Sequence, residues 1–319
     1  MKKFTCSVLF VLFTFFSITA YSDENEVRIG YLPVIASLSA YVAQENKLFE
    51  KEGIKATYKL FQSSNDIVNA MVAGEIDITP EISIIPILHL EEKYPNTVRI
   101  TSHSRITEKN PLDNLLVLKS SGINKLSDLQ GKKIGVFPGT SATNLLKAFL
   151  KNKNIDLRNI VFIPLAPTVQ IQSLESKAID ALLTYEPITT IALLQNNSKV
   201  LHSSVYTELL SPSPLAVTII SQEFKEKNPQ LAQKSINILD KSIEYIATNQ
   251  AASRLILSKY IKIPIDISNK VVLSTMMKST NIDIDNLQKC VGMLVKITEL
   301  ESELDIKNLE YSSQVNKNE

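Results

Sequence analysis

The chain has 319 residues, of which 44% are hydrophobic and 21% are charged, and its formal net charge is +1. These values are ordinary for a globular protein with a full core, and they exclude a disordered chain, a collagen-like chain and a disulfide-stapled miniprotein. The length indicates two domains or one large domain. The near-zero charge gives no indication of nucleic acid as a partner.

The N-terminus has the pattern of an export signal. Two lysines precede an apolar run over residues 8–20, and the small residues Ala20 and Ser22 stand before a strongly polar stretch. The apolar run is shorter than the about 20 residues that span a bilayer, which argues against a membrane anchor. The pattern therefore predicts a signal peptide over residues 1–22, cleaved near Ser22, and a protein exported to the periplasm.

The only cysteines are Cys6 and Cys290. Cys6 lies before the apolar run, whereas a lipid anchor needs a cysteine directly after it, so we do not expect a lipoprotein. Cleavage leaves Cys290 alone, and a single cysteine forms no intramolecular disulfide. The mature chain is expected to depend on a sizeable hydrophobic core for its stability.

Two stretches of the chain share one predicted order of strand, helix, strand, helix and strand. The first copy runs from Gly30 to Asp77, with its first helix expected over residues 38–50, and the second copy runs from Gly135 to Asp180. Strands that alternate with helices form parallel sheets covered by helices. The repeat therefore predicts an α/β protein with two lobes of similar architecture.

Two linkers are expected near residues 111–114 and 211–214, so the chain crosses between the lobes twice. A β-branched run over residues 215–220 is expected to rejoin the first lobe. Apolar spacing then predicts a long helix over residues 230–247, whose apolar face packs in the core. Further helices are expected near 251–260 and 285–300. The predicted division is a signal peptide at 1–22, lobe I from 23–112 plus 213–319, and lobe II from 113–212.

Ligands of doubly wound sheets bind beyond the carboxyl ends of the strands, so two facing lobes would share one cleft. The turn Gly139-Thr140-Ser141 opens a helix, whose free N–H groups could hold a carboxylate, sulfonate or phosphate. The alternative is that Thr140 or Ser141 is only a helix N-cap. Ser63 and Ser64, with Asp66 following, likewise either face the cleft or form a capping box.

Two glutamates end the third strands of their copies. If Glu81 and Glu186 face the cleft, they could bind amines or a cationic ring nitrogen; otherwise they are solvated or paired with nearby basic side chains. Tyr31, Phe137 and Tyr185 could form stacking walls for a planar ligand, or they could be hydrophobic packing.

The sequence contains none of the common catalytic or metal-binding patterns. Its histidines are His89, His103 and His202, and no HExxH, clustered Cys/His, GxSxG or GxGxxG motif occurs. A nucleophile for an acid–base pair of glutamates is not evident. We therefore expect no cofactor or metal, and the residues give little support to an enzyme.

Several segments resemble the solute-binding proteins of nitrate-, sulfonate-, taurine- and thiamine-precursor-type ABC importers. The resemblance runs from about residue 27 to 300 and rests on the order of its motifs. They are Ile29–Pro33, Ala43–Ile54, Ala70–Ile78, Lys119–Ile123, Leu126–Val136, Ala178–Ala181, Tyr185–Pro187 and Ser221–Phe224.

This resemblance implies a bilobal periplasmic-binding-protein fold of type 2, with two parallel-sheet lobes joined by two hinge crossovers. It also implies an ABC permease and ATPase as partners, and we expect the receptor to be a monomer. The expected ligand-binding residues are Tyr31, Leu32, Pro33, Ser63, Ser64, Glu81, His103, Gly139, Thr140, Ser141, Tyr185 and Glu186.

The chain also departs from the family pattern. Asn46 and Lys47 stand where a glycine is usual after the first helix, and Glu81 would disfavour a nearby nitrate or sulfonate. A pyrimidine-type vitamin precursor or another compound containing nitrogen or sulfur is therefore the expected ligand. The alternatives are an enzyme on the same fold, of the vitamin-precursor synthase type, and a surface adhesin or structural export protein.

Overall fold

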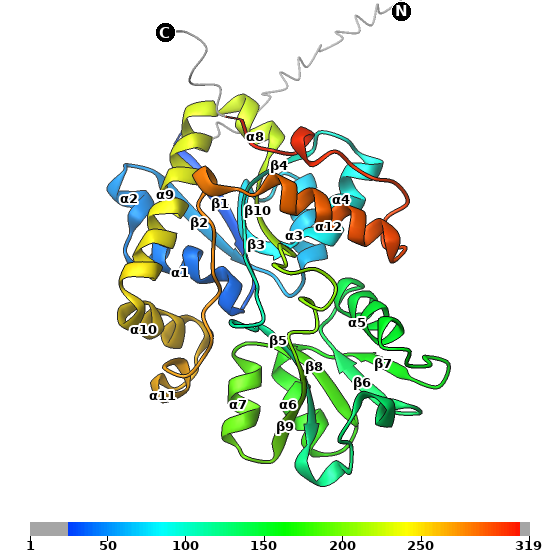
Figure 1. Ribbon diagram of the computed structural model, residues 1–319. Coiled ribbons are helices and arrows are strands. Elements are labelled where there is room, and N and C mark those ends of the chain that lie inside the picture. Colours follow the sequence, from blue (N-terminus) through cyan, green and yellow to red (C-terminus); the bar gives the residue numbers. More distant parts are fainter. Residues whose placement is uncertain (1–24, 313–319) are drawn as a thin grey trace, which may run out of the picture.

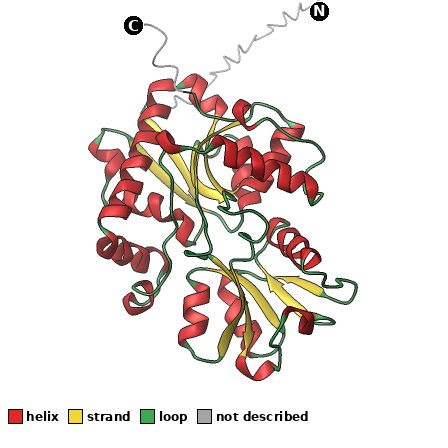
Figure 2. Cartoon of the chain, viewed as in Figure 1, coloured by secondary structure: helices red, strands yellow, loops and turns green. Residues whose placement is uncertain are grey.

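The computed structural model describes residues 25–312, so the predicted signal peptide and its cleavage site lie outside the described residues. Figure 1 shows two lobes, one above the other, and Figure 2 shows that each has strands at its centre and helices around them. None of the helices within residues 25–312 combines the length and apolar character that crossing a bilayer requires.

The first lobe contains a sheet of five strands in the order β2-β1-β3-β10-β4. β1 pairs in parallel with β2 and β3, whereas β10 runs antiparallel between β3 and β4. The strands are β1 (Glu26–Tyr31), β2 (Lys55–Leu60), β3 (Ile78–Ser83), β4 (Val98–His103) and β10 (Ala216–Ser221). The predicted return of the chain to the first lobe is confirmed by β10.

The second lobe repeats this arrangement in the order β7-β6-β8-β5-β9. β6 pairs in parallel with β7 and β8, and β5 runs antiparallel between β8 and β9. Its strands are β5 (Asp113–Leu118), β6 (Lys133–Val136), β7 (Val161–Pro164), β8 (Ala181–Tyr185) and β9 (Ser198–Ser203). The two-lobe α/β fold is thus confirmed, with sheets that are parallel within the repeat and antiparallel at the strand that follows each crossover.

Helices cover both faces of each sheet. In the first lobe these are α1 (Leu38–Glu45), α2 (Leu48–Lys51), α3 (Ser64–Val72), α4 (Ile84–Lys93), α8 (Gln222–Lys227), α9 (Pro229–Thr248), α10 (Gln250–Ile261), α11 (Ile265–Ser268) and α12 (Ile284–Lys296). In the second they are α5 (Ser141–Asn152), α6 (Pro167–Glu175) and α7 (Ile188–Leu194). Short 3-10 turns occupy Ile35–Ser37, Lys119–Ser121, Leu126–Leu129, Ser279–Asn281 and Ile306–Asn308.

The hydrophobic core follows these layers. α1 and α9 pack with β1, β3 and β10 in one cluster, and α3, α4 and α12 belong to a second cluster that also includes α5 and side chains of both sheets. α6 and α7 pack with β5 and β8 in a smaller cluster. The larger cluster therefore runs through both lobes. The amphipathic helix predicted over 230–247 is confirmed as α9.

The chain passes between the lobes twice, once between β4 and β5 and once between β9 and β10 (Figure 1). Two connections let the lobes rotate about a hinge while limiting other relative motions. The residue limits given above for the two lobes stay a prediction.

The first predicted helix, over residues 38–50, is divided in two. α1 ends at Glu45, and Lys47 adopts a left-handed conformation with φ of 50° before α2 begins. This conformation crowds the Cβ atom of most residues and is ordinary for glycine. Lys47, which stands where the family usually has a glycine, therefore has a backbone conformation that glycine adopts most easily.

Corresponding aspartates join the first and third strands of both repeats. Asp77 Oδ2 accepts a hydrogen bond from the Arg28 backbone N–H at 2.7 Å, and the Asp77 N–H donates to the Arg28 carbonyl at 2.8 Å. In the second lobe, Asp180 Oδ2 accepts from the Lys133 N–H at 2.8 Å, and the Asp180 N–H donates to the Lys133 carbonyl at 2.8 Å. The two copies of the predicted repeat therefore share this pair of hydrogen bonds between an aspartate and the first strand.

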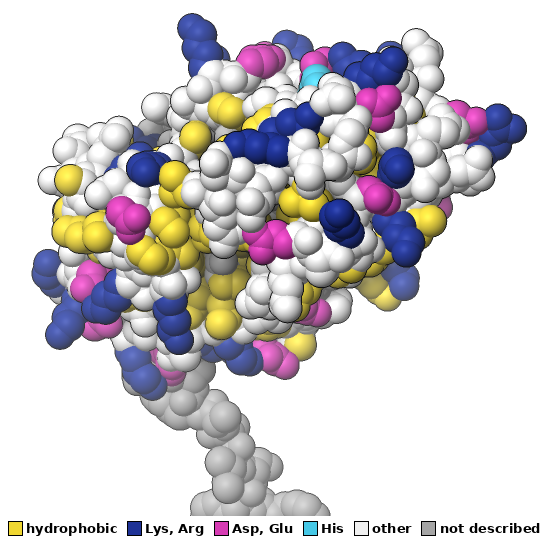
Figure 3. Space-filling view, turned by 90° about the horizontal axis from the view of Figure 1, so that it is seen from below, with side chains coloured by type: hydrophobic (Ala, Val, Ile, Leu, Met, Phe, Trp, Pro, Cys, Tyr) yellow, Lys and Arg dark blue, Asp and Glu magenta, His cyan; other side chains and the backbone are white. Residues whose placement is uncertain are grey.

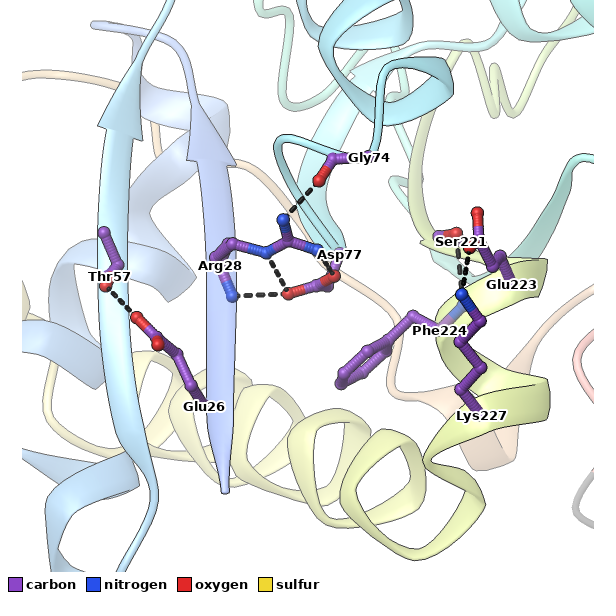
Figure 4. Close-up of polar contacts among 9 residues, drawn as sticks. All are labelled: Glu26, Arg28, Thr57, Gly74, Asp77, Ser221, Glu223, Phe224 and Lys227. Carbon is purple, nitrogen blue, oxygen red and sulfur yellow. Dashed lines mark hydrogen bonds and ion pairs between the residues drawn. The ribbon is translucent and has the colours of Figure 1, made fainter. Parts of the chain in front are cut away.

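The first-lobe contact has an additional ion pair. Figure 4 shows the Arg28 side chain reaching from β1 to Asp77 and to the Gly74 carbonyl. Arg28 Nε donates to Asp77 Oδ2 at 3.0 Å. Asp77 is only 2% exposed, so this carboxylate is largely shielded from water and has its hydrogen bonds satisfied by protein groups.

A glycine on the first strand of each copy lies tightly against the residue before the aspartate. A Cβ atom on Gly30 would lie 2.6 Å from Ile76 Cδ1, and one on Gly135 would lie 2.6 Å from Ile179 Cδ1. Both distances are far inside van der Waals contact, so a side chain at either glycine would displace the isoleucine. The same glycine, isoleucine and aspartate therefore pack together in each lobe.

The face of the molecule seen in Figure 3 carries no large patch of one charge. Basic and acidic side chains are interspersed there, with hydrophobic side chains between them. This mixed face agrees with the near-zero net charge of the sequence.

We predict that Asp77→Ala lowers the free energy of unfolding by about 3 kcal/mol, because it removes a buried carboxylate that holds the Arg28 amide and guanidinium. Urea denaturation measures the change. Glu75→Ala is the matched control, since Glu75 pairs with Lys59 at the exposed surface, where an ion pair contributes about 0–1 kcal/mol. Equal destabilisation by both substitutions would contradict the role assigned to Asp77.

Candidate functional site

A cavity of about 150 Å³ lies between the two lobes. A cavity of this size holds a benzene-sized molecule. The first lobe contributes the segment after β1, the start of α3 and the end of β3, and the second lobe contributes the turn before α5 and the end of β8. The cavity therefore lies where the carboxyl ends of strands from both sheets meet, as expected for doubly wound sheets.

Most of the predicted ligand-binding residues lie at this cavity. The structure places these side chains or backbones in its wall: Leu32, Ser64, Glu81, Gly139, Ser141, Tyr185 and Glu186. Phe137, expected as a stacking wall, also lines the cavity, and its ring meets that of Tyr185 edge-on with centroids 5.5 Å apart.

The other predicted residues lie outside the lining: Tyr31, Pro33, Ser63, His103 and Thr140. The Tyr31 ring packs edge-on against Tyr41 at 5.7 Å between centroids. Ser63 is the N-cap of α3, where its Oγ accepts from the Asp66 N–H at 3.1 Å. For Ser63 the capping alternative is therefore the one the structure shows.

His103 is buried and lies outside the cavity lining. Its Nδ1 donates to the Ser104 carbonyl at 2.7 Å, and its Nε2 accepts from the Asp283 N–H at 2.9 Å. Burial lowers the pKa of His103, which favours the neutral ring. Both ring nitrogens are engaged, so this side chain holds β4 against the start of α12.

Thr140 occupies the N-cap position of α5 but makes no side-chain capping hydrogen bond. The neighbouring Ser141 lies in the cavity wall, and its Oγ accepts from Ser83 Oγ of the first lobe at 3.3 Å. A second contact between the lobes joins Asn144 Nδ2 to Glu299 Oε2 at 2.9 Å. Side chains of α5 therefore connect the lobes at two places, of which the Ser83–Ser141 contact lies in the cavity wall.

Glu81 sits at an irregular point of β3. The register between β3 and β10 shifts between Val217 and Ile219, and the Glu81 N–H donates to Thr218 Oγ1 at 3.3 Å instead of to a ladder carbonyl. The φ of Glu81 is 26°, in the left-handed region that disfavours residues with a side chain. Such strained residues gather at functional sites, where the surrounding structure holds them in place.

Three buried carboxyl groups line the cavity, namely Glu81, Asp113 and Glu186, each at most 3% exposed. Burial raises the pKa of Glu81 to about 8 and the pKa of Asp113 and of Glu186 to about 7. Loss of water around the charged form is the main cause in each case. These groups change protonation state near neutral pH.

The hydrogen bonds of these carboxyls are incomplete. Glu81 Oε2 accepts from Ser274 Oγ at 3.1 Å, and Asp113 Oδ2 accepts from the Tyr206 N–H at 3.1 Å. Glu186 Oε2 accepts from the Thr190 N–H at 3.3 Å. Within residues 25–312, Glu81 Oε1 and Asp113 Oδ1 are buried and have no hydrogen-bond partner.

The rest of the cavity wall is apolar and aromatic. Among the described residues that line it, none is lysine, arginine or histidine. Tyr206 adds a third ring, with its centroid 6.0 Å from that of Tyr185 and a hydrogen bond between the two hydroxyls. The site thus combines acidic groups with an apolar, aromatic surface.

Asp113 and Tyr206 were not among the predicted site residues. Asp113 begins β5, next to the first crossover and two residues before the apolar run Leu115–Leu118, and a carboxylate at that place was a usable signal. Tyr206 follows β9 in a segment without a recognisable motif, so its approach to the cavity depends on the tertiary fold.

We predict that Glu81→Gln makes the protein more stable at pH 9 and leaves its stability unchanged at pH 5. Because the folded-state pKa of about 8 lies above the usual 4.5, the stability contributed by the protonated group is full below pH 4.5 and is lost as pH rises through 8. Thermal unfolding of both proteins at the two pH values measures this, with an expected gain of several degrees at pH 9. The exposed Glu50→Gln should give no pH-dependent gain; the same gain in both variants would contradict the assignment.

Comparisons with known proteins agree with this two-lobe fold. The profile of the family described as NMT1/THI5 like matches residues 35–253. A protein of Brucella abortus (strain 2308), provisionally named a binding protein, is 26% identical over 274 residues, covering 82% of this chain and 80% of its own length.

Two solved structures share the fold. The periplasmic aliphatic sulphonate binding protein SsuA from Escherichia coli has a TM-score of 0.74 at 19% identity and covers 91% of this chain and 93% of its own. The alkanesulfonate-binding protein SsuA from Xanthomonas axonopodis pv. citri, bound to MOPS, has a TM-score of 0.74 at 18% identity, covering 90% and 98%. With the profile match over most of its length, the chain described here belongs to the NMT1/THI5-like family.

Proposed function

We propose that the protein is the extracytoplasmic solute-binding component of an ABC importer, which captures a small organic molecule between its lobes and delivers it to the permease. The observation that carries the proposal is the apolar cavity with contributions from both lobes, on a chain that crosses between them twice. The names of the relatives, which are binding proteins, support a binding role.

Ligand capture follows from the position of the cavity. A molecule in it touches β3 of one lobe and β8 of the other, so it makes its full set of contacts only when the lobes are together. A ligand shifts a conformational equilibrium by its difference in affinity for the two states. The side-chain contacts between the lobes, Ser83 with Ser141 and Asn144 with Glu299, add to the same closed arrangement. The permease would then distinguish the closed receptor by its shape.

The proposed ligand is a small nitrogen-containing compound, such as a pyrimidine-type vitamin precursor. A planar ring fits against the aromatic wall that Phe137 and Tyr185 form together, and nitrogen-bound hydrogens fit the acceptor oxygens of Glu81 and Glu186. The SsuA proteins are named for sulfonates. A sulfonate offers oxygen acceptors only, and the described residues that line this cavity include no lysine, arginine or histidine to meet them.

Binding is favoured over catalysis on this fold. The vitamin-precursor synthase alternative requires a reactive group in the cavity, and the histidine closest to this role, His103, has both ring nitrogens engaged in backbone contacts outside it. We therefore propose a receptor that releases its ligand unchanged, works as a monomer and has an ABC permease and ATPase as partners.

The ligand itself is the first test. Native mass spectrometry of the purified mature protein should detect a bound small molecule, and Ala142→Trp should abolish the bound mass, because Ala142 lies in the cavity wall on α5 and is 4% exposed. Leu193→Trp is the control, since Leu193 is exposed on α7 and should leave the bound mass in place. Circular dichroism verifies that both variants are folded. A bound molecule that survives Ala142→Trp would contradict the proposed cleft.

Export is a separate expectation. Expression of the full chain in a Gram-negative host should give a periplasmic protein whose first residue is Asp23, because residues 1–22 have the signal-peptide pattern. Intact-mass analysis and N-terminal sequencing of the periplasmic fraction measure this. Recovery of the uncleaved chain from the cytoplasm alone would contradict an extracytoplasmic receptor.

A further inference from the structure

The acidic groups of the cavity carry an inference about the charge of its ligand. We propose that the cleft binds an organic cation, an ammonium or amidinium group on an apolar body, whose N–H groups donate to Glu81 and Asp113. This inference rests on the proposed function of solute capture and narrows its substrate class. A pyrimidine that carries a basic amine is one member of this class.

The first observation is the unpartnered oxygen of Glu81. The side chain is 3% exposed, Ser274 Oγ satisfies only Oε2, and Oε1 has no partner within the described residues. Leaving a buried acceptor without a donor is unfavourable. Glu81 lies in the cavity wall, and we assign the missing donor to a ligand that displaces the groups now covering Oε1.

The second observation is a matching acceptor on the other lobe. Asp113, at the start of β5, is 1% exposed, and its Oδ2 accepts from the Tyr206 N–H while Oδ1 has no partner in the described part of the chain. Glu81 lies within β3 of the first lobe, which ends at Ser83. Two acceptors offered from two lobes fit a group with two or more N–H donors, which ammonium and amidinium groups have.

The charged groups around the cavity support a ligand with a positive charge. Glu81, Asp113 and Glu186 are its acidic members, and the hydroxyls of Tyr185 and Tyr206 are its other titratable groups. No basic side chain occurs in its lining among residues 25–312. A buried carboxylate without a cationic partner is costly to ionise, and a cation placed beside it favours the ionised form.

The aromatic rings fit the rest of such a ligand. Phe137, Tyr185 and Tyr206 line the cavity, and their faces attract cations as well as apolar groups. An anion of the same size would gain the apolar contact but would be repelled by the ionised carboxylates, and no basic side chain is present in the described lining to attract it. We therefore expect the cavity to select cations over anions by their charge more strongly than by their shape.

The number of protons released on binding distinguishes a contact between the ligand and these carboxyl groups from a purely structural role of the carboxyl groups. Since burial raises the pKa of Glu81 to about 8 and that of Asp113 to about 7, these groups hold protons near neutral pH. A cation that favours their ionised forms must expel protons to the buffer, whereas a neutral ligand need not. Proton release on binding therefore reports the charge of the bound group.

Isothermal titration calorimetry of the mature protein at pH 7.5 tests the proposal with three probes of similar shape: benzamidinium, benzamide and benzenesulfonate. We expect benzamidinium to bind at least about tenfold more tightly than the other two. Titrations in phosphate and in Tris, which differ in ionisation enthalpy, should show release of about one proton per benzamidinium bound.

Substitutions of the two carboxyl groups test whether these groups bind benzamidinium. Glu81→Gln and Asp113→Asn should each weaken benzamidinium binding about tenfold or more and reduce proton release, while the exposed Glu50→Gln should change neither. If one cavity variant fails to fold, the proposal is tested by the other variant and by which of the three probes the wild-type protein binds most tightly. Equal or tighter binding of benzenesulfonate, no measurable binding of benzamidinium, or unchanged binding in both cavity variants would overturn the inference.

The two proposals fail differently. A folded mature protein that carries no cleft-dependent small molecule of any charge contradicts the solute-binding function. A neutral or anionic molecule that is found in the cleft and displaced by Ala142→Trp leaves the solute-binding function standing and overturns the cationic class alone.

Discussion

In both lobes an aspartate at the start of the third strand holds the backbone of the first. Asp77 and Arg28 exchange carboxylate and backbone hydrogen bonds in one lobe, and Asp180 and Lys133 do so in the other. The β1–β3 ladder has a single pair in register, so the aspartate contact extends a short parallel pairing. Parallel strands have no hairpin turn to set their register. These contacts help to align the opposite, carboxyl ends of the strands, where the cavity is built.

The cavity holds several groups that are unfavourable on their own. Glu81 combines a positive φ with a buried carboxyl, and Asp113 leaves one oxygen unpaired. A hydrophobic cluster that includes side chains of both lobes surrounds them and holds them in place. In the proposed receptor these acceptors would be oriented before a ligand arrives, and such preorganisation lowers the free energy lost on binding. Under the same proposal, stability and ligand binding would both depend on pH through these groups.

The sequence predicted the architecture well because periodicity and repetition are local signals. The spacing from Gly30 to Asp77 and from Gly135 to Asp180 indicated the two similar lobes, and strand ends led to Glu81, Tyr185 and Glu186. The sequence analysis did not predict that the helix breaks at Lys47, because lysine rarely adopts a left-handed backbone conformation. The ligand role assigned to Ser63 and His103 lacks support from the cavity, since their polar atoms meet backbone groups that only the folded chain brings near.

The place of β10 in the first sheet has a consequence for the order of assembly. β10 ends at Ser221 and lies between β3 and β4, although those two strands precede it by more than a hundred residues. All strands of the second lobe are complete by Ser203. During synthesis the inserted lobe thus acquires its whole sheet first, while β4 waits for its central neighbour. The lobe that contains β1 is therefore the last to complete its sheet.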